Sequence, residues 1–163
     1  MKKILFLVFT LFLISKSYSQ AGEWATISYS YSKGPVSPEY QYNFIILINE
    51  TGAGKLTYTK SSITKEYDFA VGKKGLNKLN KALMKSKVFV LSEENLKSDK
   101  NITGGPQKDL LINRLQYATQ DTKPATIQVP SQVNVKYSDN INKLYETIEG
   151  LVSPDIWDKA RSQ

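Results

Sequence analysis

Residues 40–71, YQYNFIILINETGAGKLTYTKSSITKEYDFAV, decide the fold, because apolar and polar side chains alternate on either side of turn sequences. Every second side chain of the first strand is large and apolar: Tyr40, Tyr42, Phe44, Ile46 and Ile48. A glycine turn follows at residues 51–54, and the alternation returns at residues 55–59 and 65–71. Strands that follow one another through short turns predict an antiparallel sheet.

The second face of the strongest strand also carries apolar residues, Ile45 and Leu47. Apolar side chains on both faces predict a central strand that is partly covered on each side. Upstream, Ile27, Tyr29 and Tyr31 occupy alternate positions, which predicts one more strand before this one.

The hydrophobic period changes after residue 71. Leu76, Leu79, Leu83 and Met84 recur at helical spacing between Gly72 and a predicted helix end near residue 87. The apolar run at residues 88–91 is expected to enter the core as a short extended segment. Residues 92–108 are polar and predict a long loop, with one helical turn at residues 93–97.

Two strands, at residues 109–117 and 124–129, are predicted after this loop. A helix capped by Ser138 or Asp139 follows, and Ser153 then caps a last helical turn that starts at Pro154. The predicted order is ββββαββα. The fold class is therefore α+β, with an antiparallel sheet of about six strands and two main helices packed on one face.

The N-terminus has the pattern of an export signal. Lys2 and Lys3 precede an apolar run at residues 4–14, and small residues stand at Ser17 and Ser19. We expect cleavage before Gln20, a single α+β domain at residues 20–163, and a secreted or periplasmic location. The chain has no cysteine, so the signal is not that of a lipoprotein, and no membrane insertion is expected after cleavage.

Composition excludes several chemistries. With no cysteine and no histidine, the chain cannot form the usual zinc sites or a Ser-His or Cys-His couple. Gly52, Gly54 and Lys55 lack the spacing of a nucleotide-binding loop. Arg114 and Arg161 are the only arginines, which argues against a nucleic-acid reader. We therefore predict no cofactor, no metal site and no catalytic residue.

Two features are candidates for binding. Tyr29, Tyr31, Tyr40 and Tyr42 are predicted to share a sheet face; they belong to the core if helices cover that face and are binding residues if they do not. Gly104 and Gly105 precede Pro106 in the polar loop. This pair fits either a tight turn or a close backbone approach by a partner, and the turn is favoured.

Lysines form a stripe along the first predicted helix: Lys74, Lys78, Lys81 and Lys85. Such a stripe could attract an anionic polysaccharide or membrane surface. The favoured interpretation is the solvated face of a helix whose leucines are buried. Removal of the signal peptide and its three lysines lowers the net charge from +7 to +4.

The layout resembles a family of small, uncharacterised exported bacterial proteins. The resemblance rests on a Ser-Pro-Glu-Tyr entry to the tyrosine-rich strand at residues 37–42, a lysine- and leucine-rich helix with its apolar run at residues 76–91, and Pro154 to Trp157 near the C-terminus. A Gly-Gly loop leads into the strand between them. The resemblance implies no activity and no catalytic residues.

These observations predict an exported, non-enzymatic binding domain whose partner is a protein or a cell-envelope component. An inhibitor or an immunity protein would be one form of it. A hydrolase that uses two carboxylates in a concave pocket is one alternative. A carrier of a small ligand, with an apolar cavity between sheet and helices, is another.

Overall fold

The computed structural model describes residues 24–37, 40–99, 104–115 and 126–162. The predicted signal peptide and its cleavage site lie outside the described residues, as do the predicted strand residues 116–117 and 124–125. The described strands are β1 (Trp24–Ser32), β2 (Tyr42–Asn49), β3 (Ala53–Lys60), β4 (Ile63–Ala70), β5 (Gln107–Arg114) and β6 (Thr126–Val129).

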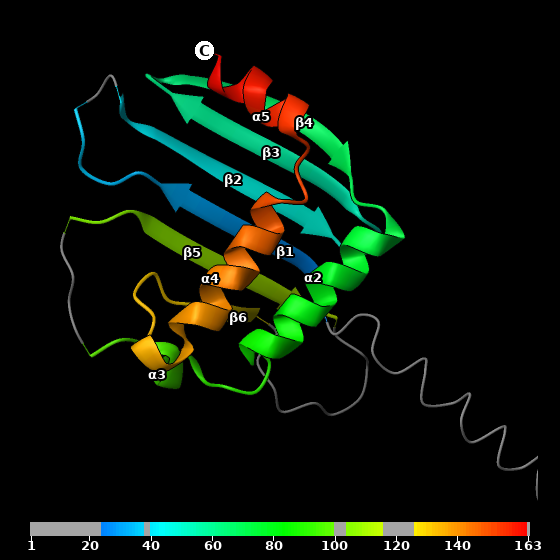
Figure 1. Cartoon of the computed structure of the whole chain (residues 1–163), viewed down its shortest axis with the longest axis vertical. Coiled ribbons are helices and arrows are strands. Elements are labelled where there is room, and N and C mark those ends of the chain that lie inside the picture. The colour runs from blue at the N-terminus through cyan, green and yellow to red at the C-terminus, as the bar shows by residue number, and fades with distance from the viewer. Residues whose placement is uncertain (1–23, 38–39, 100–103, 116–125, 163) are drawn as a thin grey trace, which may run out of the picture.

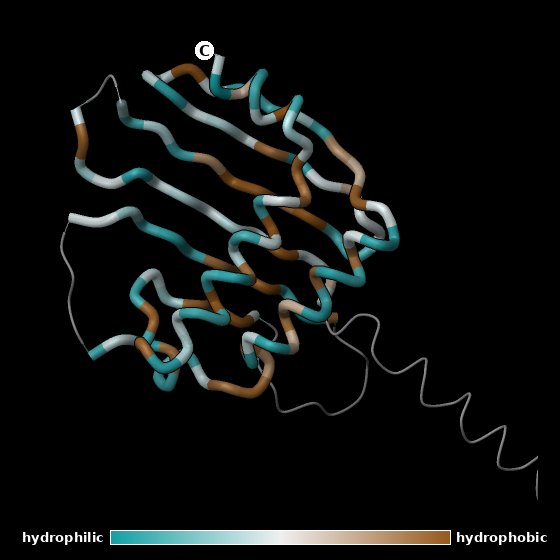
Figure 2. Tube along the Cα trace, viewed as in Figure 1, coloured by the Kyte–Doolittle hydropathy of each residue, from teal (hydrophilic) through white to brown (hydrophobic). Residues whose placement is uncertain are grey.

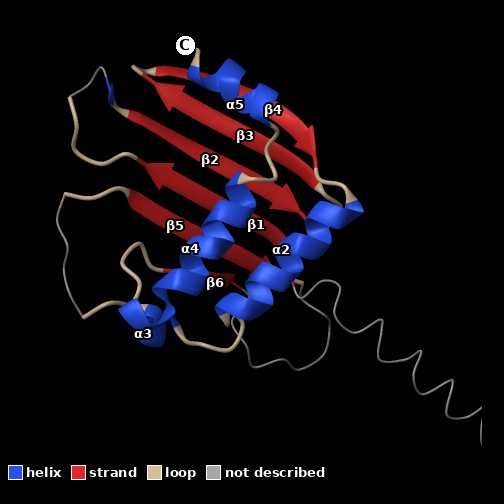
Figure 3. Ribbon diagram, viewed as in Figure 1, coloured by secondary structure: helices blue, strands red, loops and turns tan. Residues whose placement is uncertain are grey.

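The six strands form one sheet in the order β4-β3-β2-β1-β5-β6, and every neighbouring pair is antiparallel. The described helices are α2 (Lys73–Ser86), α3 (Glu93–Leu96), α4 (Val135–Glu149) and α5 (Pro154–Arg161). Figures 1 and 3 show α2, α4 and α5 on the same face of the sheet. The predicted α+β class and one-sided helix layer are confirmed, and the predicted element order ββββαββα roughly matches the observed one, in which α3 and α5 are additional short helices.

The core lies between the sheet and these helices. Side chains at alternate strand positions point into it, among them Ile27 of β1, Ile46 of β2 and Ile112 of β5, all fully buried. Leu79 and Leu83 of α2 close it from above, and the indole nitrogen of Trp24 donates to Asn80 Oδ1 at 2.8 Å. Figure 2 shows the resulting alternation of apolar and polar residues along the chain.

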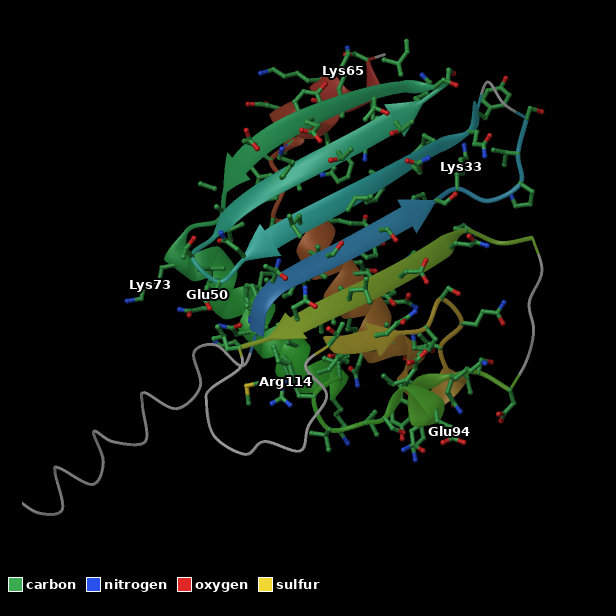
Figure 4. The ribbon with its side chains drawn as sticks, turned by 180° about the vertical axis from the view of Figure 1, so that it is seen from behind. Lys33, Glu50, Lys65, Lys73, Glu94 and Arg114 are labelled. Carbon is green, nitrogen blue, oxygen red and sulfur yellow. The ribbon has the colours of Figure 1, made fainter. Side chains whose placement is uncertain are left out.

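The other face of the sheet is open. Figure 4 views the molecule from this side, and among the described residues no helix lies over the sheet. Ile45, Leu47 and Leu111 are 44%, 43% and 41% exposed. The prediction that the second face of β2 is partly covered was therefore wrong for Ile45 and Leu47, because the long helices in the described part of the chain pack on the opposite face.

Helix α2 begins at Lys73, directly after Gly72 as predicted, whereas α4 begins earlier than predicted. Helix α4 is capped by Asn134, whose side chain accepts a hydrogen bond from the backbone N–H of Lys136 at 3.0 Å, and not by Ser138 or Asp139. Asn134 has the same capping chemistry as the predicted residues and lies one turn closer to β6. Ser153 does precede the last helix, and Pro154 occupies its first turn.

The apolar run after α2 is a turn and not the predicted extended segment. Lys87 adopts a left-handed conformation with φ 60°, and its carbonyl accepts from the N–H groups of Val90 and Leu91 at 3.0 Å each. The turn buries Val88 and leaves Val90 82% exposed. A left-handed residue at a helix end reverses the chain, so only part of the run reaches the core.

Candidate functional site

Part of the helix-bearing face is not covered by helices. Figure 1 shows α4 crossing β1 and β5 while α5 lies along β3 and β4, so that the ends of β1 and β2 nearest Ser32 and Tyr42 project beyond both helices. Tyr31 and Tyr42 lie at this end, and together with the buried Tyr58 beside them we call them the tyrosine ladder. They come from three adjacent strands.

The rings of the ladder stack from strand to strand. The ring centroids of Tyr42 and Tyr58 are 5.6 Å apart with an interplanar angle of 15°, and those of Tyr31 and Tyr42 are 5.7 Å apart at 24°. Phe44 stacks on Tyr31 at 5.1 Å and meets the Trp157 ring edge-on at 4.9 Å. Aromatic pairs of this kind hold one another in place. Tyr31 and Tyr42 nevertheless remain half-buried.

Two cations lie near the ladder. Lys33 Nζ lies 5.4 Å from the Tyr42 ring centroid and 5.9 Å from that of Tyr40. Arg161 lies 5.0 Å from the Trp157 ring on the α5 side. Each of these is within the range of a cation–π contact. The uncovered end is thus aromatic at its centre and basic at its margin.

The carboxylate of Glu149 lies beside Tyr29, two residues before Tyr31 of the ladder on β1. The Tyr29 hydroxyl donates to Glu149 Oε1 at 2.7 Å. Burial, followed by this hydrogen bond, raises the pKa of Tyr29 far above the usual tyrosine value. Burial and a hydrogen bond with Tyr42 raise the pKa of Tyr31 to about 12. The raised pKa values keep both hydroxyls protonated at pH 10, where a free tyrosine is half ionised.

The four tyrosines singled out in the sequence have different environments. Tyr29 is fully buried under α4, where it stacks on Tyr145 at 4.9 Å, so the core interpretation holds for it. Tyr31 and Tyr42 are neighbours at the uncovered end. Tyr40 does not share the strand face: its backbone N–H bonds to the Ser37 carbonyl in a turn before β2, and its side chain is 61% exposed.

Gly104 and Gly105 lie near the same end of the sheet. A Cβ atom at Gly34, the residue beyond β1 and Lys33, would lie 2.6 Å from the Gly105 carbonyl oxygen. The two turns are thus in close backbone contact. Gly104 has φ +93°, a backbone conformation that glycine adopts without steric cost.

A cavity of about 730 Å³ lies beside this turn, between it and the start of α4. Gly104, Gly105, Lys108 and Tyr145 are among its lining residues. Tyr145 is 2% exposed, and its buried hydroxyl has no hydrogen-bond partner among the described residues. Lys108 Nζ lies 5.5 Å from the Tyr145 ring, and Lys108 is paired with Tyr31 in the sheet. The cavity and the tyrosine ladder are therefore neighbours.

The cavity does not offer the groups needed for carboxylate catalysis. None of its described lining residues is an aspartate or glutamate, whereas glycoside hydrolysis needs two. Within the described part of the chain, no group of three or more acidic side chains is placed to hold a metal ion. What the arrangement offers is aromatic surface, hydroxyl groups and cations.

Sequence reasoning missed four residues of this region: Lys33, Tyr58, Tyr145 and Glu149. Tyr58 follows Leu56 at the strand period, so its face could have been predicted. The other three reach the site through the packing of loops and helices on the sheet. Periodicity within one segment carries no information on such contacts.

No protein-family model matches the chain, and no curated protein sequence matches it. The described helices include none that is long and apolar enough to span a bilayer.

Proposed function

We propose that this protein is an exported, non-enzymatic domain that binds a protein or a cell-envelope component through the uncovered end of its helix-bearing face. The observation that carries the proposal is the stacked pair of half-buried tyrosines, Tyr31 and Tyr42, with the exposed Tyr40 and the half-buried Lys33 beside them. Tyrosine and basic side chains are common contact residues, because they combine apolar area with hydrogen bonding or charge.

The surroundings of the ladder support this proposal. Its rings are fixed by stacking, so little side-chain freedom is lost when a partner packs on them. The adjoining Gly104-Gly105 turn offers backbone groups without side chains, which permits a close approach. The absence of acidic side chains from the described lining of the neighbouring cavity favours binding over hydrolysis.

The test is retention of envelope material by the immobilised chain without residues 1–19. We expect the double variant Lys33→Gln, Tyr40→Ala to lose the material that the unaltered protein retains. A matched control is Lys136→Gln, Tyr137→Ala, which removes another lysine–tyrosine contact, of 5.5 Å, on α4. Equal retention by both variants, or no specific retention by the unaltered protein, would contradict the proposal.

A small-ligand carrier is the second candidate function, because Tyr145, whose buried hydroxyl has no partner among the described residues, is one of the residues that line the 730 Å³ cavity. A buried donor without a partner is costly unless a ligand or water satisfies it. Mass spectrometry of the native protein, purified from its own envelope, would show a bound small molecule that is lost in Tyr145→Phe. Purification of the native protein without any such molecule would remove this candidate.

A further inference from the structure

Helix α2 carries five exposed lysines, which we call the lysine ridge: Lys73, Lys74, Lys78, Lys81 and Lys85. We propose that the lysine ridge is a docking surface for a linear acidic polysaccharide. The 14-residue helix contains no acidic residue. Its charge is therefore of one sign along its whole length.

The ridge is not neutralised by the protein itself. None of its lysines forms an ion pair with any residue that the structure describes. The chain does pair a lysine elsewhere, since Lys55 Nζ lies 2.8 Å from Glu66 Oε2. Figure 4 shows Glu50 on the same side of the molecule as Lys73, but no ion pair joins them. The ridge is thus an unpaired basic surface that can attract an anion.

The lysines also line a groove. A depression of about 770 Å³ lies between α2 and the end of α4, and Lys73, Lys74, Lys78 and Lys81 are on its wall. Gly75 and Gly150 contribute no side chains to it, and Leu151 adds a half-buried apolar contact. Four ammonium groups around one groove give a path that a chain-like ligand can follow.

The spacing of the charges suits a polymer. Lys74, Lys78 and Lys85 follow the helix axis over 11 residues, which is roughly 17 Å at about 1.5 Å per residue. Lysine is a compact charge on a flexible stem, so it suits carboxylate or sulfate groups repeated along a chain better than one fixed bidentate contact.

The composition of the groove separates a polysaccharide from other polyanions. No aromatic residue is among its described lining residues, whereas single-stranded nucleic acids are held largely by base stacking on aromatic rings. Helices that lie on bilayers usually insert Trp, Phe or Leu beside their basic residues, and the groove offers only Leu151, half-buried. The expected export of the chain also favours an envelope polysaccharide.

The ridge is separate from the tyrosine ladder. Figure 1 shows α2 at the opposite end of β1 and β2 from Ser32 and Tyr42. A substitution that abolishes binding at one surface is therefore expected to leave binding at the other surface unchanged. The polysaccharide proposal does not depend on the proposed function, so either one can be wrong while the other is right.

The test measures binding of the chain without residues 1–19 to polygalacturonate and heparin in low salt, with neutral dextran as the blank. We expect Lys74→Glu, Lys78→Glu to bind both acidic polymers about tenfold more weakly, and higher salt to weaken binding by the unaltered protein. The control Lys65→Glu, Lys136→Glu makes the same change in net charge at β4 and at the far end of α4. It should bind within about twofold of the unaltered protein.

Three results would overturn the proposal. The first is equal loss of binding in the two double variants, which would show an effect of net charge alone. The second is no binding of either acidic polysaccharide. The third is tighter binding to oligo-deoxythymidine or to phosphatidylglycerol vesicles than to both polysaccharides. Urea unfolding of each variant shows that the fold is retained.

Discussion

Glu149 is the residue at which the sheet, α4 and α5 meet. Its carboxylate accepts from the Tyr29 hydroxyl of β1 at 2.7 Å, and its carbonyl accepts from the Trp157 indole nitrogen of α5 at 3.2 Å. Trp157 in turn packs on Phe44 of β2. One residue therefore fixes α4 and α5 relative to the strands that carry the tyrosine ladder.

The Tyr29–Glu149 hydrogen bond gives a residue-scale prediction. Tyr29→Phe keeps the ring and its stacking on Tyr145 but leaves a partly buried carboxylate without its donor. We expect the free energy of unfolding to fall by about 1.5–3 kcal/mol, the usual contribution of a hydrogen bond to a charged group. Urea unfolding measures it, with Tyr40→Phe as the exposed control. Equal stability of the two variants would show that the bond contributes little.

The tyrosine pKa values give a prediction at alkaline pH. Burial raises the pKa values of Tyr29 and Tyr145 far above 10.0, and burial with the Tyr42 hydrogen bond raises the pKa of Tyr31 to about 12. Above pH 10 the unfolded chain loses protons that the folded chain keeps, so the free energy of unfolding falls as pH rises toward 12. Below about pH 10 these three tyrosines are protonated in both the folded and the unfolded chain, so they cause no change of the free energy of unfolding with pH.

Tyrosinate absorbance measures the ionisation of the tyrosines directly, because lysine ionisation does not affect it. In a titration of the folded protein, part of the total tyrosinate absorbance should appear only well above pH 10, whereas a sample in denaturant should titrate with its midpoint near pH 10. Coincident titration curves for folded and unfolded protein would contradict the assigned burial.

At the scale of elements, the β2–β3 hairpin depends on a close backbone contact at Gly52. Gly52 has φ +92°, and its carbonyl accepts from the Val71 N–H at 2.7 Å. A Cβ atom at Gly52 would lie 2.3 Å from the Val71 carbonyl oxygen. This contact joins the hairpin to the start of α2.

Gly52→Ala should therefore cost more stability than Gly104→Ala. Both residues have similar positive φ, for which a side chain costs about 1–3 kcal/mol, but a Cβ at Gly104 meets no described atom within 4 Å. We expect a lower melting temperature for Gly52→Ala than for Gly104→Ala. The reverse order would show that the contact with Val71 is easily relieved.

Helix α2 has its charges unfavourably placed at one end. Lys73 and Lys74 lie in the first turn, where no acidic residue is present, and the positive end of the helix dipole repels them. We expect Lys74→Glu to raise the free energy of unfolding by about 0.3–1 kcal/mol, and Lys85→Glu in the last turn to lower it by a similar amount. Changes of the same sign in urea unfolding would refute this effect. If Lys74→Glu raises the free energy of unfolding and also weakens polysaccharide binding, the loss of binding is not caused by loss of the fold.

Local patterns predicted most of the elements. The alternation of Ile27, Tyr29 and Tyr31 and the helical spacing of Leu79 and Leu83 are properties of single segments, and both appear in the structure. The exposure of Ile45 could not be predicted in this way, because it depends on the sheet face on which distant helices pack. For the same reason, Lys33 and Glu149 could not be assigned to the ladder from the sequence.

The whole molecule has two different faces and two separate candidate surfaces. One sheet face bears the helices and, beyond them, the tyrosine ladder with its basic margin. The other face is open, with the exposed Ile45, Leu47 and Leu111 paired with polar residues of neighbouring strands, among them Ser28, Ser30 and Thr57. The central claim is that the partner contacts the uncovered end of the helix-bearing face and not the open face of the sheet.

Site-specific photocrosslinking in cells that produce the protein tests this claim most directly. A photoreactive phenylalanine analogue replaces Tyr40 in one variant and Leu47 in another; both side chains are exposed, so neither replacement disturbs the core. We expect a discrete crosslinked product from position 40 and none from position 47. A product from position 47 alone, or from neither position, would contradict it.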